Sequence, residues 1–177
     1  MKTDNQKIMP CLTFNHQAEE AANFYVSIFS PVFENSKVLN IARFSKEELE
    51  ALSYLPEDIR PGPAGSVRTV RFLLNGQEIE AVNGGKYFNF CEGMSLYVRC
   101  ESQEEIDWFW EKLSEGWEKS QCGWLKDKYG VSWQIAPAIV EEMLNDPDTE
   151  KSNRVIITIY GMKKYDIETL KRAYEGR

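Results

Sequence analysis

The apolar residues of this chain recur with two different periods, and each change of period predicts a boundary between a strand and a helix. A period of two predicts four strands in the first half, over residues 8–14, 36–44, 66–74 and 77–83. Between the first two strands, apolar residues spaced by three and four predict a helix over residues 17–29, which Pro31 ends. The Asn75-Gly76 pair separates the last two strands and predicts a tight hairpin.

The same order of elements returns in the second half. A strand over residues 94–100 precedes a helix over residues 103–113, whose start carries the capping pair Ser102 and Glu105. Three further strands are predicted over residues 117–120, 121–126 and 131–136. Because one βαβββ unit closes its own core poorly, we predict an α+β fold in which tandem βαβββ modules form a curved mixed sheet.

Two segments lie outside this repeat. Residues 45–65 combine a short acidic helix with several prolines and glycines, and a connection of this length is typical of a lid, a dimer contact or a mobile loop. Added C-terminal helices are predicted over residues 138–144, 149–162 and 167–174. The run 155–159 favours a strand by propensity, but the caps and flanks around it favour a helix.

Composition narrows the expected partners. The 177 residues carry a formal net charge of −7, which argues against a nucleic-acid partner, since that would need a basic surface. No apolar run approaches the roughly 20 residues of a membrane span, and the first ten residues lack the apolar core of a signal peptide. We therefore expect a cytoplasmic protein without a membrane partner. Four cysteines without close pairing, together with the single histidine His16, do not make a zinc motif, and the cysteines are expected to be reduced.

Several segments resemble one known family. The matching stretches are residues 10–25, 62–67, 83–85, 121–135, 146–148 and 162–167. The most specific of them reads Q-C-G-W-L-K-D-K-Y-G-V-S-W-Q-I. On these stretches the chain resembles the vicinal oxygen chelate (glyoxalase/bleomycin resistance/dioxygenase) superfamily, and within it the PhnB-like branch, the 3-demethylubiquinone-9 3-methyltransferase-like domain. The resemblance implies one domain over 1–177, with a first module over 1–91, a second over 92–136 and a C-terminal helical extension over 137–177.

The resemblance also implies where a metal would bind. Metal-dependent members of the superfamily carry ligands at four strand positions, which fall here at Pro10, at residues 81–82, at Met94 and at Gln134. Proline, methionine, alanine and valine cannot hold a hard divalent ion, and one amide is not a metal site. We therefore expect no metal and no cofactor. Methyltransferase activity is also not expected, because no G-x-G turn follows a strand in the context that an adenosylmethionine pocket usually needs.

Aromatic residues supply the candidate ligand site. Four aromatic side chains are predicted to form an apolar cleft, Phe88, Phe90, Trp124 and Trp133, and two amides are predicted to orient the ligand, Asn83 and Gln134. Arg71 and Cys122 complete the candidates; no catalytic residue is identified. The alternative interpretation is that the aromatic residues pack in the core or in a dimer interface, and that Arg71 pairs with Glu78 or Glu80 across the hairpin. Cys122 is expected on a strand and has no nearby histidine to activate it.

Three functions are compatible with these residues. The leading hypothesis is a metal-independent homodimer that binds a small aromatic or apolar molecule. The competing hypothesis is a metal-dependent lyase or dioxygenase whose ligands are His16, Glu78, Glu80, Glu92 and Gln134. The third is an interaction module without a small ligand, which would use residues 45–65 and the C-terminal helices as its contact surface.

Overall fold

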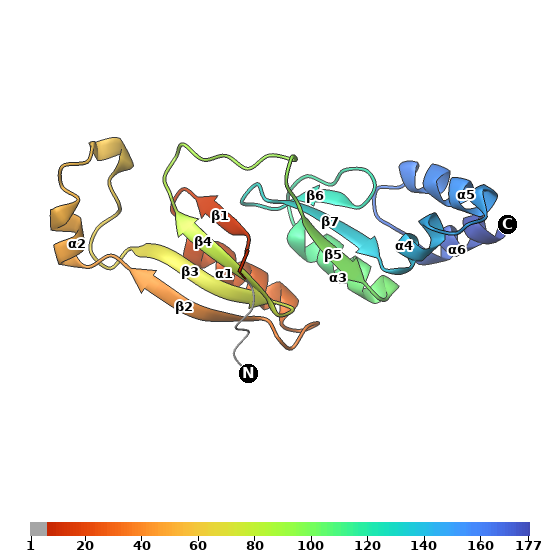
Figure 1. Ribbon diagram of the computed structural model, residues 1–177, viewed down its shortest axis with the longest axis horizontal. Coiled ribbons are helices and arrows are strands. Elements are labelled where there is room, and N and C mark those ends of the chain that lie inside the picture. The colour runs from red at the N-terminus through yellow and green to blue at the C-terminus, as the bar shows by residue number, and fades with distance from the viewer. Residues whose placement is uncertain (1–6) are drawn as a thin grey trace. The chain divides into compact units, whose positions relative to one another are not determined.

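The structure is a computed structural model that describes residues 7–177, apart from the side chain of Asp58. The chain divides into two compact units, Met1–Asn89 and Phe90–Arg177. Each unit contains its own mixed sheet and its own helices (Figure 1), which confirms the predicted α+β class.

The first unit is a four-stranded sheet with one long helix. Its elements are β1 (Cys11–Phe14), α1 (Ala18–Phe29), β2 (Lys37–Arg43), α2 (Lys46–Ala51), the 3₁₀ helix η1 (Glu57–Ile59), β3 (Val67–Leu74) and β4 (Gln77–Asn83). The strand order is β1-β4-β3-β2, in which β1 runs parallel to β4 and the other neighbours are antiparallel. The predicted hairpin at Asn75-Gly76 joins β3 to β4, and both residues have the positive φ that such a turn requires.

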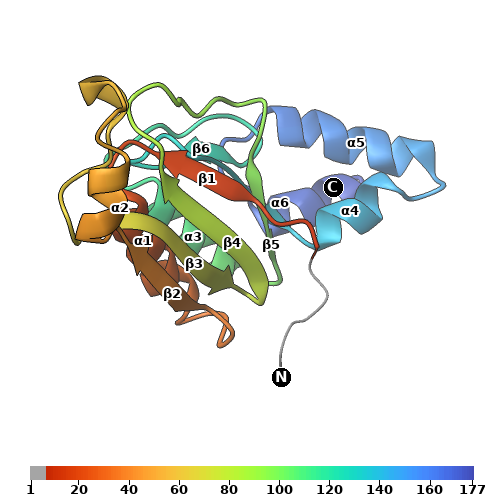
Figure 2. The same ribbon diagram turned by 60° about the vertical axis from the view of Figure 1, so that its left-hand side comes forward.

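Helix α1 covers one face of this sheet (Figure 2). Successive residues of a strand point to opposite faces, so Val70 and Phe72 of β3 lie under the helix and are fully buried. The ring of Tyr25 stacks on Phe72 at a centroid distance of 6.2 Å. The apolar stripe predicted for this helix therefore forms the core of the first unit.

The second unit is a three-stranded sheet that carries a helix and a C-terminal helical extension. Its elements are β5 (Leu96–Cys100), α3 (Gln103–Leu113), β6 (Trp124–Lys126), β7 (Ser132–Pro137), α4 (Ile139–Leu144), α5 (Thr149–Tyr160) and α6 (Ile167–Glu175). The strand order is β5-β7-β6, with β5 parallel and β6 antiparallel to β7. Helix α3 packs on this sheet and buries Ile106, Phe109, Trp110 and Leu113.

The run 155–159 is helical, as its caps predict. The side chain of Asp148 accepts hydrogen bonds from the backbone N–H groups of Glu150 and Lys151 and so caps α5. Within the helix Val155 and Ile159 are buried, and α5 packs against α4 and α6. No helix among residues 7–177 is long and apolar enough to cross a membrane.

Two local predictions in the second unit are wrong. Residues 117–120 do not form a strand; only a single bridge joins Lys119 to Leu125. Cys122 does not lie on a strand either, because β6 begins at Trp124 and Cys122 occupies the turn before it with φ of 56°. The chain turns tightly at Cys122 and Gly123, whose φ values of 56° and 76° lie in the left-handed region, and β6 therefore starts only after this turn.

Candidate ligand pocket

Two predicted site residues of the first unit, Asn83 and Arg71, form bonds that stabilise the fold. The Asn83 side chain accepts a hydrogen bond from the Ala18 N–H over 2.9 Å and donates one to the Val67 carbonyl over 3.0 Å. Its amide thus joins β4 to the start of α1 and to β3. The guanidinium Nε of Arg71 donates to Glu78 over 2.5 Å, which is one of the two pairings predicted for the hairpin.

Phe88 and Phe90 lie in the loop that follows β4. The Phe88 side chain is 58% exposed, and its ring lies directly over Gly84, where an added Cβ would come within 3.1 Å of it. Phe90 is half-buried and belongs to the second unit. A ligand-binding role for these two rings stays a prediction.

In the second unit, Trp133 and Gln134 point to opposite faces of β7. Trp133 is 1% exposed, and its indole N–H donates to a carboxylate oxygen of the fully buried Asp127 over 2.8 Å. The other oxygen of Asp127 accepts from the backbone N–H groups of Tyr129 and Val131. The structure therefore places Trp133 in the core, where it anchors the hairpin turn.

Gln134 lies on the other face of the sheet, beside Trp124 and Tyr97. Both of these residues are its register partners, on β6 and β5 respectively. The Gln134 amide donates to the Ser95 hydroxyl over 2.8 Å. Of the predicted cleft residues, Trp124 and Gln134 are therefore the two that share a sheet face in this unit.

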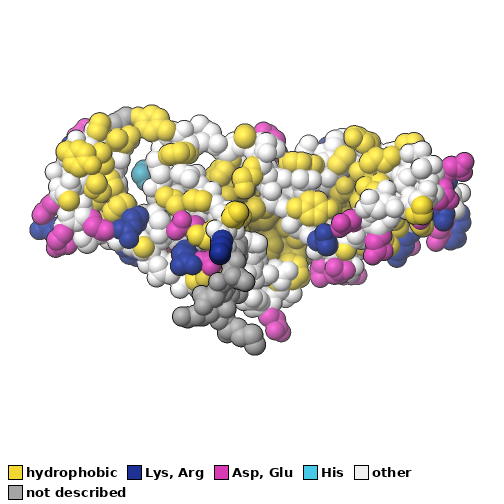
Figure 3. Space-filling model, viewed as in Figure 1, with side chains coloured by type: hydrophobic (Ala, Val, Ile, Leu, Met, Phe, Trp, Pro, Cys, Tyr) yellow, Lys and Arg dark blue, Asp and Glu magenta, His cyan; other side chains and the backbone are white. Residues whose placement is uncertain are grey.

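A pocket of about 470 Å³ opens in the second unit between the start of β6 and the C-terminal helices. We call it the C-terminal pocket; its lining residues are Ser120, Gln121, Cys122, Trp124, Leu144, Ile156, Ile159, Tyr160 and Tyr165. It contains two of the predicted site residues, Cys122 and Trp124. Hydrophobic side chains are exposed at several places on the face drawn in Figure 3. On α5 the exposed large hydrophobic residues are Ile157 and Tyr160.

The turn at residues 121–123 is docked on the end of α5. The backbone N–H groups of Cys122 and Gly123 donate to the carbonyls of Met162 and Lys163 over 2.8 and 2.7 Å. The Cys122 thiol lies 3.6 Å from the Ile159 carbonyl oxygen and donates to it. A Cβ at position 123 would come within 2.4 Å of the Ile135 carbonyl oxygen, so this close approach requires glycine.

The segment between α5 and α6, residues 161–166, contributes Tyr165 to the pocket and is bonded to α3 at Gln103 and Asp107. The Gln103 amide donates to the Tyr165 carbonyl over 3.1 Å and accepts from the Ile167 N–H over 2.9 Å. Lys164 donates to Asp107 over 2.6 Å, and this contact lowers the pKa of the Asp107 carboxyl. These bonds fix Tyr165, whose ring packs against Gly123.

The chemistry of the C-terminal pocket is neutral. None of its nine lining residues carries a charged side chain, and three of them are aromatic. Tyr165 is only 7% exposed, and burial raises the pKa of its hydroxyl to about 12, so that the phenol stays protonated at neutral pH. Such a wall suits an uncharged molecule with apolar surface.

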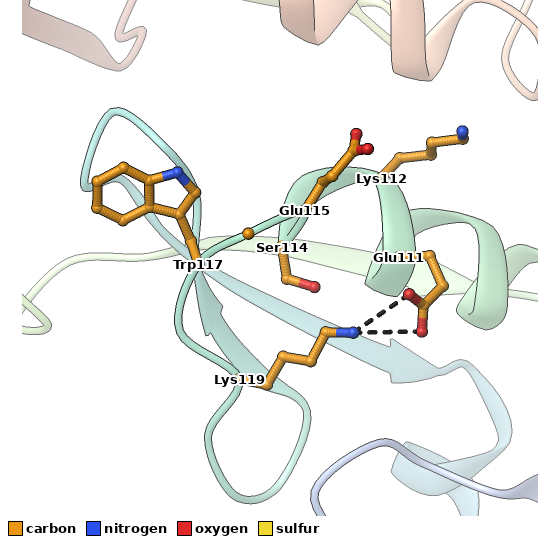
Figure 4. A pocket seen from close by; sticks show the side chains of 7 residues that line it. Glu111, Lys112, Ser114, Glu115, Trp117 and Lys119 are labelled. Atoms are coloured by element: carbon orange, nitrogen blue, oxygen red, sulfur yellow. Dashed lines mark hydrogen bonds and ion pairs between the residues drawn. The ribbon is translucent and has the colours of Figure 1, made fainter.

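A second pocket, of about 540 Å³, lies at the end of α3. We call it the α3-end pocket (Figure 4); its lining residues are Glu111, Lys112, Ser114, Glu115, Gly116, Trp117 and Lys119. Four of these seven residues are charged, and Lys119 forms an ion pair with Glu111 at 3.2 Å. None of the predicted site residues lies in it.

Comparison with known proteins decides the family. The family model described as 3-demethylubiquinone-9 3-methyltransferase matches residues 6–136. The chain belongs to this family. The PhnB protein of Bacillus cereus is 37% identical to it, with a TM-score of 0.60, and the match covers 75% of this chain and 100% of that one. The resemblance predicted from the sequence is confirmed.

More distant solved structures are also similar to this PhnB-like chain. Protein PA1353 from Pseudomonas aeruginosa is 18% identical with a TM-score of 0.54, over 73% of this chain and 96% of that one. A glyoxylase/bleomycin resistance protein/dioxygenase domain from Frankia is 14% identical with a TM-score of 0.44, over 73% of this chain and 88% of that one. No curated protein matches the chain.

The metal chemistry known in the superfamily does not fit the residues of this PhnB-like chain. Pro10 precedes β1, Ala81 is fully buried, Met94 is 59% exposed, and Gln134 is bonded to Ser95. Among the described residues, no group of three or more His, Cys, Asp or Glu could hold a metal ion.

The alternative metal ligands, too, form bonds with other residues or are exposed. Glu78 is bonded to Arg71, Glu92 forms an ion pair with Lys126, and His16 is exposed. Glu80 lies opposite Cys11 in the sheet of the first unit.

The family match ends before the residues that complete the C-terminal pocket. Five of the nine lining residues lie beyond residue 136, namely Leu144, Ile156, Ile159, Tyr160 and Tyr165. None of these five residues is among the site residues predicted from the sequence. Their common signal is that they belong to an amphipathic helix or to the segment next to it, and this signal does not show what the apolar face covers.

Proposed function

We propose that this protein binds a small, partly aromatic molecule in the C-terminal pocket and that it does so without a metal. The observation that carries the proposal is the neutral lining of this pocket. In this lining, Cys122 and Trp124 of the Q-C-G-W segment lie next to apolar residues of the C-terminal helices. A concave apolar surface with a few polar groups is the usual form of a small-molecule site.

Neither metal catalysis nor methyl transfer is part of the proposal. The positions at which related proteins hold a metal carry apolar residues or an amide here, and such residues are poor ligands for divalent ions. Although the family description contains the word methyltransferase, we do not propose this activity for the chain. An adenosylmethionine pocket usually needs a glycine-rich turn between a strand and a helix, and the Gly84-Gly85 pair follows β4 without a helix after it.

A homodimer in the cytoplasm completes the proposal. The dimer is supported by the resemblance to the PhnB-like branch, and the cytoplasmic location by four cysteines without paired spacing. Sedimentation equilibrium of the purified chain tests the assembly: a species of twice the chain mass is expected, and a monomer at all concentrations would refute the dimer.

Equilibrium dialysis with 2-ethylnaphthalene, a neutral apolar probe, tests the pocket. We expect one probe bound per chain, and a loss of at least about tenfold in affinity for Ile156→Glu, because a carboxylate would then face an apolar wall. The matched control is Ile157→Glu, whose side chain lies on the same helix but is 72% exposed and does not line the pocket. Equal affinity in the two variants would refute the site.

Metal content of the same preparation gives the second measurement. We expect less than stoichiometric zinc, manganese, nickel or iron after purification without chelators. A tightly held ion at one per chain would refute the metal-independent part of the proposal and would favour the metal-dependent enzyme.

A further inference from the structure

The Tyr165 hydroxyl is a polar group that the fold of the second unit leaves without a partner. The residue is 7% exposed and lines the C-terminal pocket. Among the described residues, no group forms a hydrogen bond with this hydroxyl. The hydroxyl is not one of the fully buried unpartnered oxygens of residues 7–177, which are Ser66 Oγ and Ser132 Oγ, so it is accessible and can bond a group that enters the pocket.

The position of this hydroxyl is fixed by the fold. The Tyr165 carbonyl is held by Gln103 and the ring packs on the backbone of Gly123. Lys164, the preceding residue, is bonded to Asp107 of α3. The phenol is thus preorganised before any ligand binds, and this reduces the entropic cost of forming a hydrogen bond to the ligand.

The hydroxyl serves as a donor at neutral pH. Burial raises its pKa to about 12, so the O–H proton is retained. The other residues on the pocket wall with a hydroxyl, amide or thiol group are Ser120, Gln121, Cys122 and Tyr160. The Cys122 thiol already donates to the Ile159 carbonyl, and Tyr160 is 73% exposed, whereas Tyr165 is 7% exposed. No cation lines the pocket that could neutralise an anionic ligand.

We propose that the C-terminal pocket selects uncharged aromatic ligands that carry a carbonyl or comparable acceptor, and that Tyr165 donates a hydrogen bond to that acceptor. The aromatic part of the ligand lies against Trp124 and Tyr160. This inference rests on the proposed function, since it assigns the ligand class and the recognising group of the same pocket.

Three probes of one shape test the inference by equilibrium dialysis against the full chain: 2-acetylnaphthalene, 2-ethylnaphthalene and 2-naphthoate. They differ in that the first is a neutral ketone, the second lacks an acceptor and the third is an anion. We expect the ketone to bind about three- to tenfold more tightly than the hydrocarbon, which is the usual worth of one neutral hydrogen bond. The anion is expected to bind at least about tenfold more weakly than the ketone.

The variant Tyr165→Phe removes the hydroxyl and keeps the ring. It should bring the affinity of the ketone down to that of the hydrocarbon and leave the hydrocarbon unchanged. If the ratio of the two affinities stays the same in this variant, Tyr165 is not the donor. If 2-naphthoate binds as tightly as the ketone, the neutral ligand class is wrong.

If the C-terminal pocket does not bind small molecules at all, the three probes give a different result from the one that excludes Tyr165 as the donor. None of the three probes would then bind, or all three would bind equally well to Ile156→Glu and to the unaltered chain. Either result overturns the inference together with the pocket on which it rests.

Discussion

The α3-end pocket and the C-terminal pocket are similar in size and opposite in chemistry. The α3-end pocket measures about 540 Å³ and four of its seven lining residues are charged, whereas the C-terminal pocket measures about 470 Å³ and none of its nine lining residues is charged. The α3-end pocket is formed by one local stretch, residues 111–119. The C-terminal pocket combines four separate stretches of the chain, residues 120–124, 144, 156–160 and 165. Volume alone therefore does not identify a binding site, while long-range assembly of a neutral wall is a stronger indication.

Two glycines with the same φ of 76° give the strongest test of this difference. Gly123 borders the C-terminal pocket, and a Cβ there would lie 2.4 Å from the Ile135 carbonyl oxygen. We expect Gly123→Ala to lower the free energy of unfolding by about 3 kcal/mol or more, because backbone strain and a backbone clash add together. Urea unfolding followed by tryptophan fluorescence measures the loss.

Gly116 of the α3-end pocket is the matched control. A Cβ there would meet no heavy atom within 4 Å, so Gly116→Ala should cost only the roughly 1–2 kcal/mol of a left-handed residue. Equal losses at the two glycines would show that the docking of the turn on α5 contributes little to stability.

Removing one tryptophan from each pocket gives the next largest expected effect. Trp124→Ala should weaken binding of 2-acetylnaphthalene by about tenfold, since a stacked aromatic wall is worth roughly 1.5 kcal/mol. Trp117→Ala should leave binding unchanged, because Trp117 is 54% exposed and lines the charged pocket. Equilibrium dialysis measures both. A larger loss from Trp117→Ala would move the ligand site to the α3-end pocket.

Weakening the bonds that hold residues 161–166 to α3 should have a smaller effect on ligand affinity. Asp107→Asn removes the carboxylate that Lys164 contacts at 2.6 Å, and we expect affinity for the ketone to fall about threefold while backbone amides near Tyr165 exchange faster. Amide hydrogen exchange and dialysis measure these changes. Lys171→Met is the control, since it removes an ion pair with Glu168 within α6 and should change neither quantity.

The bonds between residues 161–166 and α3 should also respond to acid. Lys164 holds the pKa of Asp107 below its ordinary value of 3.8 in the folded protein. A carboxyl whose folded pKa is lowered contributes stability that is present above the ordinary value and is lost as the pH falls through the folded pKa. The protection factors of amides near Tyr165, which correct for the intrinsic effect of pH on exchange, should therefore fall only below pH 3.8, and Asp107→Asn should show no such step. An unchanged acid response in the variant would exclude this ion pair as the cause.

The sequence predicted the regular elements better than the pocket. Helix α3 begins and ends where its capping pair and apolar spacing predict, at Gln103 and Leu113. These signals are local, because a cap or an Asn-Gly turn acts within a few residues. Local signals also confirmed α5 against the strand propensity of its apolar run.

The pocket depends on contacts between distant residues, and the sequence did not show them. Trp133 and Gln134 are predicted to line one cleft, but the period of two puts adjacent strand residues on opposite faces of the sheet. Tyr165 was missed because nothing near it marks a site. Its burial arises from Gln103, more than sixty residues earlier, and from the close approach of Gly123.

The smallest expected effect concerns the ion pair of the α3-end pocket. Lys119 and Glu111 have side chains 36% and 62% exposed, so water and salt screen their attraction. Lys119→Met should therefore change the free energy of unfolding by less than about 0.5 kcal/mol and should leave probe binding unaltered. Urea unfolding at low salt and at roughly 1 M NaCl measures the effect, which should vanish at high salt. A loss above about 1.5 kcal/mol that persists at high salt would mean that these charges are held as a built site, and the α3-end pocket would then deserve the same ligand tests as its neutral neighbour.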